Sequence, residues 1–172
     1  RPDAFCRFAA GSAGVTLPQA GAYAVAMFFL PTDDAVRGQC RLLLERAVSH
    51  AGMTPLCWRD VPADNGCLGE LARRCEPRIA QLFIDGEGRT GEDFERALYL
   101  ARRRAERLVR EQMGPPGEDF YVVSMSSRTL CYKGMFFAPQ LFAYYPDLAD
   151  ERLVSALALV HQRYSTNTLP NW

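Results

Sequence analysis

The sequence predicts an α+β fold in which helices pack against one or two β-sheets. Short, wholly apolar runs of strand length alternate with longer segments whose apolar residues recur at helical spacing. The elements come in groups, without strict βαβ order and without an internal repeat, which favours two sheets or one large mixed sheet between helices. With 172 residues, 48% of them hydrophobic, the chain can bury the core of one domain.

The first fifty residues are predicted to hold two helices and a strand. An apolar set at helical spacing lies in residues 1–14. Residues 22–30, AYAVAMFFL, are almost wholly apolar, so we expect a strand buried on both faces. Thr32 or Asp33 can cap the next helix, and Gly52 can end it. The inward stripe of that helix is Val36, Cys40, Leu43, Leu44, Ala47 and Val48.

The middle of the chain is predicted to hold two strands and two helices. Residues 54–61 and 79–84 have strand patterns, and a short helix over about residues 68–74 lies between them. Thr90 and Asp93 approximate a capping box for the longest helix. Its expected inward residues are Phe94, Ala97, Leu98, Ala101, Ala105 and Leu108.

The outer face of this longest helix is rich in arginine. Such a run could hold phosphate, but acidic residues stand beside it, so we expect a solvated face with ion pairs along the helix. The arginines are Arg102, Arg103, Arg104, Arg107 and Arg110, and the acidic residues are Glu92, Glu95, Glu106 and Glu111.

The last third is predicted to begin with a hairpin. Residues 119–125 and 129–135 have strand patterns around a tight turn at residues 126–128. Residues 138–145 form an apolar connector interrupted by proline. Asp150 can then cap a short helical turn.

The end of the chain has the pattern of a buried strand that leads into a polar loop. Residues 157–160 are apolar, and we expect His161 to be a hydrogen-bonded core histidine. Arg163 offers a planar guanidinium that fits a carboxylate. The hydrogen bonds of a polar ligand could be completed by Thr166, Asn167 and Thr168, although the same groups could simply satisfy the backbone of a turn.

Charge and hydropathy exclude several classes of protein. Basic and acidic residues number 20 each, so nothing in the charge balance asks for nucleic acid or an anionic membrane as partner. No apolar run approaches the ~20 residues of a membrane span, and no signal segment is present. We therefore expect a cytoplasmic chain without a membrane partner.

The cysteines do not form a metal-site pattern. They lie far apart without a Cys-x-x-Cys pair, so we expect no metal site and no disulfide framework. Most should be small buried residues, with Cys40 and Cys131 the clearest cases. The six are Cys6, Cys40, Cys57, Cys67, Cys75 and Cys131.

Six strings in collinear order extend over almost the whole chain: YAVAMFFLP at 23–31, WRDVP at 58–62, LGELARRCEPRIAQLFI at 68–84, SSRTLCYKGM at 126–135, APQLFAYYPDL at 138–148 and HQRYSTNTLPNW at 161–172. Together they resemble the glutaminase domain of glutamate synthase large chains, a class II glutamine amidotransferase. The resemblance implies the four-layer αββα sandwich of the N-terminal-nucleophile hydrolases. It also implies that a cysteine thiolate attacks the glutamine amide, releases ammonia and leaves a glutamyl thioester that water hydrolyses.

The family's nucleophile is the first residue of the mature enzyme, whose α-amino group, with a pKa near ~8, serves as base. Here position 1 is Arg, and Cys6 lies inside a predicted helix without a free amine. We expect the family's opening segment and its Asn-Gly oxyanion pair to lie outside residues 1–172. We therefore expect residues 1–172 to be the central part of a single domain, incomplete at both ends, inactive alone and without a catalytic residue of its own.

The resemblance implies a glutamine-binding loop. Arg163 matches the arginine that binds the α-carboxylate of glutamine, and Tyr164 matches an aromatic position of the loop that closes over the substrate. Thr166 and Asn167 match its polar positions. The SSRTLCYKGM string is assigned a supporting role, with Arg128 and Lys133 as structural ion partners.

The resemblance places the cofactors, FMN and an iron-sulfur cluster, in other regions of the parent enzyme. Its implied partners are glutamine, the synthase domains of the same polypeptide and a small subunit that oxidises NADPH through FAD. One alternative is a non-catalytic module that binds glutamine or docks a domain. Another is a thiol enzyme that uses Cys57 or Cys75, for which the sequence places no histidine or acid.

Overall fold

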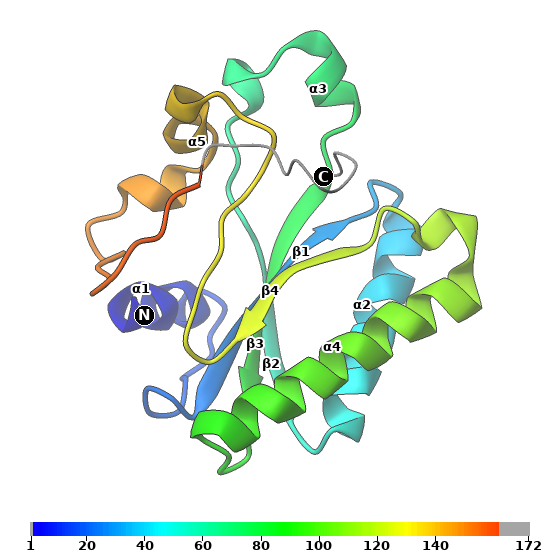
Figure 1. Ribbon diagram of the computed structural model, residues 1–172, viewed down its shortest axis with the longest axis vertical. Helices are drawn as coiled ribbons and strands as arrows, with labels where there is room; N and C mark the ends of the chain where they lie inside the picture. Colours follow the sequence, from blue (N-terminus) through cyan, green and yellow to red (C-terminus); the bar gives the residue numbers. More distant parts are fainter. Residues whose placement is uncertain (1, 162–172) are drawn as a thin grey trace.

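The computed structural model describes residues 2–161, whose strands form one antiparallel sheet (Figure 1). The four strands have the order β2-β3-β1-β4, so β1 and β3 are central and the other two form the edges. Their bounds are β1 Tyr23–Leu30, β2 Thr54–Asp60, β3 Arg78–Asp85 and β4 Tyr121–Ser126.

The central strand β1 is buried along its whole length, which confirms the prediction for this segment. Successive side chains point to opposite faces of a sheet. Ala24, Ala26, Phe28 and Leu30 accordingly join one apolar cluster. Tyr23 and Val25 join a second cluster on the other face, and Met27 and Phe29 join a third.

Two long helices, α2 (Asp34–His50) and α4 (Gly91–Met113), cover the first face. The predicted cap of α2 is confirmed, because the Val36 amide donates to Asp33 Oδ1 over 2.9 Å. Gly52 follows α2 with φ 71°, a left-handed conformation that suits glycine. The capping box predicted for α4 is wrong: Thr90 precedes the helix, but its side chain makes no cap hydrogen bond.

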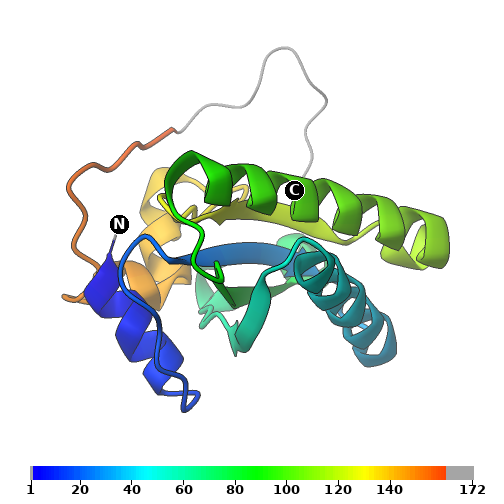
Figure 2. The same ribbon diagram turned by 90° about the horizontal axis from the view of Figure 1, so that it is seen from below.

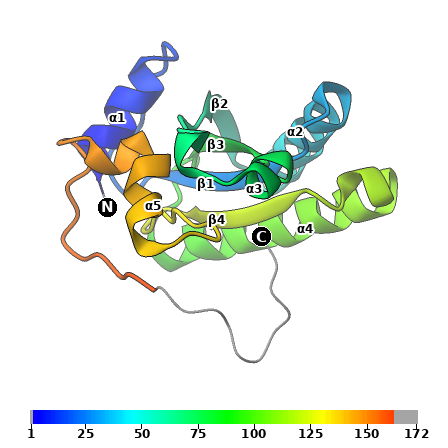
Figure 3. The ribbon, with the colours of Figure 1, turned by 90° about the horizontal axis from the view of Figure 1, so that it is seen from above.

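The second face carries shorter elements. Helix α1 (Asp3–Gly11) lies there, α3 (Glu70–Arg74) follows β2, and α5 (Ala138–Tyr144) packs nearby. In Figures 2 and 3 the sheet lies between α1 and α5 on the left and α2 on the right. Short 3₁₀ turns occupy Asn65–Cys67, Pro115–Gly117 and Pro146–Ala149.

The prediction of a second hairpin strand at residues 129–135 is wrong, since no strand lies there. Its polar groups bind other elements: the Tyr132 hydroxyl donates to Asp147, and the Lys133 carbonyl accepts from Tyr145. The connector predicted at residues 138–145 is instead helix α5. Pro139 lies in its first turn, where the missing N–H would have had no helical partner.

Asp150 ends the last 3₁₀ turn, and its Oδ1 accepts from the Arg152 amide over 2.8 Å, so it caps a single turn that does not extend into a helix. The other predictions for the end of the described chain are wrong. Residues 157–160 form no strand, and His161 is exposed where a core histidine was predicted. Leu157, Leu159 and Val160 are 81%, 94% and 78% exposed. A strand needs a neighbour for its backbone hydrogen bonds, and no described strand pairs with this run.

The α+β prediction is therefore confirmed, with one sheet in the part of the chain that the structure describes. The second sheet of the predicted sandwich is not found among residues 2–161. None of the helices in that range is both long and apolar enough to cross a bilayer.

Candidate functional site

The predicted glutamine-binding residues Arg163, Tyr164, Thr166 and Asn167 lie outside the described residues. The structure does describe the segment that leads to them, from α5 to His161, and the sheet face on which that segment packs.

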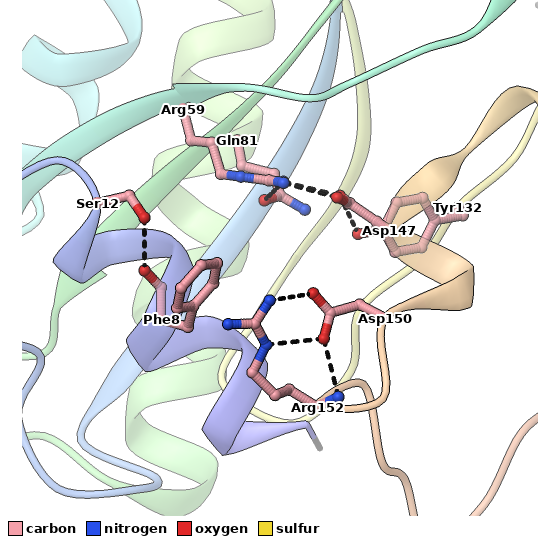
Figure 4. A network of polar contacts seen from close by, with 8 residues as sticks. All are labelled: Phe8, Ser12, Arg59, Gln81, Tyr132, Asp147, Asp150 and Arg152. Atoms are coloured by element: carbon pink, nitrogen blue, oxygen red, sulfur yellow. Dashed lines mark hydrogen bonds and ion pairs between the residues drawn. The ribbon is translucent and has the colours of Figure 1, made fainter.

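A buried ion pair ties this segment to the sheet (Figure 4). Arg59, on β2, donates from Nη1 to Asp147 Oδ2 over 2.8 Å and from Nη2 to Oδ1 over 2.6 Å. Only 17% of the Arg59 side chain and 6% of the Asp147 side chain are exposed. Such a two-pronged pair fixes distance and orientation together, so the turn Pro146–Ala149 has one defined place on the sheet.

Two further side chains complete this network. Gln81 Oε1 accepts from Arg59 Nη1 over 3.0 Å, and the Tyr132 hydroxyl donates to Asp147 Oδ2 over 2.8 Å. Gln81 is opposite Arg59 in the β2–β3 register and is fully buried. Its Nε2 has no hydrogen-bond partner among the described residues.

Two members of the network, Arg59 and Tyr132, keep their protons near neutral pH. Burial, followed by the charge of Asp147 and the hydrogen bond to it, raises the pKa of Tyr132. Burial opposes the charge on Arg59, but the hydrogen bonds and charge of Asp147 outweigh it and raise the pKa of that guanidinium. Neither group exchanges a proton in the range where a general acid or base works. Arg59 and Tyr132 therefore position the chain and do not transfer protons.

A second contact holds the same segment to α1. Arg152 lies over the Phe8 ring, with Cζ 3.3 Å from the ring centroid, and it pairs with Asp150. Figure 4 shows the two guanidinium–carboxylate pairs, Arg59 with Asp147 and Arg152 with Asp150, close to α1. Hydrogen bonds from Arg152 lower the pKa of Asp150 to about 2.

Helix α5 is held by aromatic side chains. The Tyr144 hydroxyl donates to Glu76 Oε1 over 2.6 Å, and the Tyr145 hydroxyl donates to the Lys133 carbonyl over 2.9 Å. The two tyrosine rings meet edge to face at 4.8 Å, and Phe136 packs against both. Burial is the main cause that raises the pKa of each tyrosine, so both hydroxyls stay protonated donors.

The end of β4 is held by a single carboxylate. Glu95, in the first turns of α4, accepts from the Ser126 hydroxyl and from both the amide and the hydroxyl of Ser127. The prediction for Arg128 is confirmed, because it pairs with Glu92 at 2.8 Å. The ion pair predicted for Lys133 is wrong, since its Nζ donates to the Tyr121 hydroxyl over 3.1 Å.

Three of the described cysteines, Cys40, Cys57 and Cys131, do not have the surroundings of a nucleophile. Burial raises the pKa of Cys57 and of Cys131, and it raises the pKa of Cys40 to about 11. A reactive cysteine needs the opposite shift, so the structure gives no support to a thiol enzyme based on Cys57. Within residues 2–161, no group of three or more His, Cys, Asp or Glu side chains could hold a metal ion.

The sequence reasoning missed the polar network. Its signal was present, since Arg59 and Gln81 interrupt strand runs that are otherwise largely apolar. A polar residue inside a buried strand requires a partner. What the pattern could not supply was the partner's identity, because Asp147 lies 88 residues along the chain from Arg59.

Comparison with known proteins identifies the family. The family of class II glutamine amidotransferases matches residues 1–172. The glutamate synthase [NADPH] large chain of Azospirillum brasilense is 42% identical over 151 residues, which are 87% of this chain and 10% of the relative. That of Bacillus subtilis is 38% identical over 173 residues, covering 99% of this chain and 11% of the relative.

A third relative, the glutamate synthase [NADH] of Schizosaccharomyces pombe, is 36% identical over 179 residues, which are 99% of this chain and 8% of the relative. The chain thus spans about a tenth of the length of these relatives. Since the family match extends from the first residue to the last, the chain belongs to the class II glutamine amidotransferases.

Proposed function

We propose that residues 1–172 are the central part of the glutaminase domain of a glutamate synthase, which supplies ammonia for the reductive conversion of 2-oxoglutarate to glutamate. The observation that carries this proposal is the match of glutamate synthase large chains over 87% and 99% of the chain. The fold of residues 2–161 supports a scaffold role for this part of the domain.

In the proposed reaction a cysteine thiolate attacks the side-chain amide carbon of glutamine. The C–N bond breaks, the nitrogen takes a proton and leaves as ammonia, and a glutamyl thioester remains. Water then cleaves the thioester to release glutamate and restore the thiol. We place the nucleophile outside residues 1–172, because Cys6 is 1% exposed inside α1 and its backbone amide donates to the Pro2 carbonyl.

The contribution of this chain to the reaction is to bind glutamine. Arg163 would pair with the α-carboxylate through two parallel hydrogen bonds, and Tyr164 would close over the ligand. Thr166 and Asn167 would accept and donate the remaining hydrogen bonds. The ion pair of Arg59 with Asp147 and the stacking of Arg152 on Phe8 would hold the preceding segment in place.

The proposed domain has the αββα sandwich, with the sheet of residues 2–161 as one of its two sheets. Two features favour this arrangement. The long helices α2 and α4 cover one face of the sheet, as the outer layer of a sandwich does. Residues 157–160 are apolar and exposed, and a second sheet would cover them.

The proposed cofactors, FMN and an iron-sulfur cluster, belong to other regions of the parent enzyme, which we place in the cytoplasm. Its proposed partners are its own synthase domains and a small FAD- and NADPH-dependent subunit. The relatives differ in electron donor, as their names give NADPH, NADH or ferredoxin. We therefore propose that the electron donor is determined by regions of the polypeptide outside residues 1–172.

The test is ammonia release from glutamine by the full-length polypeptide, together with intact mass and N-terminal sequencing. We expect an N-terminal cysteine, equal amounts of ammonia and glutamate, and no release after that cysteine is replaced by alanine. A protein that binds glutamine without releasing ammonia would overturn the glutaminase proposal. It would then be a glutamine-binding module on the same scaffold.

A further inference from the structure

A groove of about 650 Å³ lies between the end of α2 and the middle of α4. The two helices pack side by side, as Figure 1 shows in cyan and green. Its lining includes small side chains, of which Ala47 and Ala101 are buried and Ala97 is half-buried. Leu100, which also lines the groove, is 58% exposed. A floor of alanines lets the backbone of a partner come close.

Basic side chains dominate the walls of this groove. Four arginines line it against a single carboxylate, Glu106, although the whole sequence has a formal net charge of zero. Arg103 pairs with Glu106 at 2.6 Å, and Arg107 lies 3.6 Å from Glu111. Arg104 and Arg110 have no ion pair within residues 2–161. The ion pairs along the helix that the sequence predicts therefore neutralise only part of this positive charge.

The spacing of these arginines brings like charges close together on α4. Arg104, Arg107 and Arg110 are three residues apart, so they lie on one face of α4. Like charges at this spacing repel one another and weaken a helix. An anionic partner in the groove would remove that repulsion.

The distance over which these arginines extend along α4 favours a row of carboxylates over a single phosphate as the partner. Arg103 and Arg110 are separated by seven residues, or about 10 Å along the helix axis at ~1.5 Å per residue. A single phosphate needs donors that converge on one point, whereas a row of carboxylates can meet donors spread over two turns. Guanidinium groups bind carboxylates through paired hydrogen bonds, and the alanine floor with Leu100 suits the apolar side of an amphipathic segment.

We propose that this groove docks an acidic amphipathic segment from another domain of the same polypeptide. The relatives are about ten times as long as this chain, so such domains are available to it. The proposal goes beyond the glutaminase function, since none of the groove residues belongs to the glutamine-binding loop.

The composition of the chain allows a direct test. Lys133 is the single lysine of the sequence. In the full-length protein, Arg104→Lys and Arg107→Lys would each place one amine in the groove and keep its charge. A zero-length carbodiimide couples an amine to a carboxylate in contact with it, and mass spectrometry of the peptides identifies both ends. The matched control is Arg74→Lys on α3, whose neighbour Glu70 supplies a known local carboxylate.

We expect both groove variants to couple to a group of Asp or Glu residues outside residues 1–172. The yield should fall several-fold between about 0.05 M and about 1 M salt, where the screening length shrinks to ~3 Å. The control should couple to Glu70 alone. Coupling of the groove variants only to Glu106 or Glu111, or to nothing, would overturn the proposal. So would coupling between ¹⁴N- and ¹⁵N-labelled molecules, which would identify a second copy as the occupant.

Discussion

The two faces of the sheet are stabilised in different ways. The core of the face under α2 and α4 is apolar, from Phe28 and Leu82 on the strands to Leu98 on α4. Its polar contacts lie at the β2 edge, where Trp58 donates to Glu45 and Arg41 pairs with Asp60. The opposite face carries a charged residue and an amide, Arg59 and Gln81, and a carboxylate from a distant segment neutralises the charge. Apolar burial has no preferred direction, whereas the ion pair admits one arrangement of its groups.

This difference indicates what each face contributes. The helix-covered face stabilises the sheet and tolerates side chains of similar volume. The opposite face determines where the segment from Tyr132 to Arg152 lies, through directional contacts with β2 and α1. That segment continues toward the predicted glutamine-binding loop.

The largest effect is expected from Asp147→Ala. Removing the carboxylate leaves the buried Arg59 guanidinium without a counter-charge, which should destabilise the domain by about 3–5 kcal/mol. Urea unfolding followed by the fluorescence of Trp58, in a Trp172→Phe background, measures the change. The double replacement Arg59→Met with Asp147→Leu should recover most of the loss. A loss below ~1 kcal/mol, typical of surface pairs, would show that the two faces do not differ in this way.

On the helix-covered face, Leu98→Ala should cost about 2–5 kcal/mol, because a fully buried side chain leaves a cavity. The cost should not change with salt, since no charge is involved. The control, Leu98→Met, keeps the volume and should cost less than ~1.5 kcal/mol. Thermal or urea unfolding at low and high salt tests both statements, and a strong salt dependence would contradict the account of this face.

A smaller effect is expected from Glu95→Ala. The change leaves the Ser127 amide and two serine hydroxyls without their acceptor, at a cost of about 1–3 kcal/mol. Glu95→Gln keeps one acceptor oxygen and should cost less. Hydrogen exchange at the Ser127 amide measures the local loss of protection at the end of β4. Unchanged protection there would mean that Glu95 does not hold the end of β4.

The smallest effect concerns Asp150. Its pKa of about 2 lies below the ordinary value of ~3.9. Because the folded-state pKa is lowered, the link to Arg152 stabilises the fold above the unfolded-state pKa and is lost as the pH falls through about 2. A carboxyl carbon NMR titration measures the midpoint. Arg152→Gln should return it to the ordinary value, and a midpoint near 4 in the unmodified protein would contradict the contact.

The strands and the long helices were predicted well from the sequence, whereas the segments that connect them were predicted poorly. Strands such as β1 and helices such as α2 follow from apolar periodicity and from a local cap, which depend on neighbouring residues alone. The segment from Thr129 to Met135 has a strand pattern, but Tyr132 and Lys133 hydrogen-bond to Asp147 and Tyr145, which follow helix α5. Such long-range partners cannot be predicted from local pattern.

The same distinction applies to the candidate site. Resemblance to the family supplied Arg163 and its neighbours, whereas local pattern misassigned the apolar run at residues 157–160 as a strand. That prediction assumed neighbouring strands that the described residues do not provide. The network around Asp147 was missed because its members are close in space and far apart in sequence.

The proposed role of Arg163 is tested most directly by the glutamine kinetics of Arg163→Met in the full-length protein. Loss of a charged hydrogen-bonding partner of the substrate carboxylate, worth about 1.5–3 kcal/mol, should lower kcat/KM roughly ten- to a hundredfold, mainly through KM. Arg128→Met, which removes the exposed pair with Glu92, is the matched control and should leave KM unchanged. If Arg163→Met also leaves KM unchanged, this chain does not bind the glutamine carboxylate through Arg163.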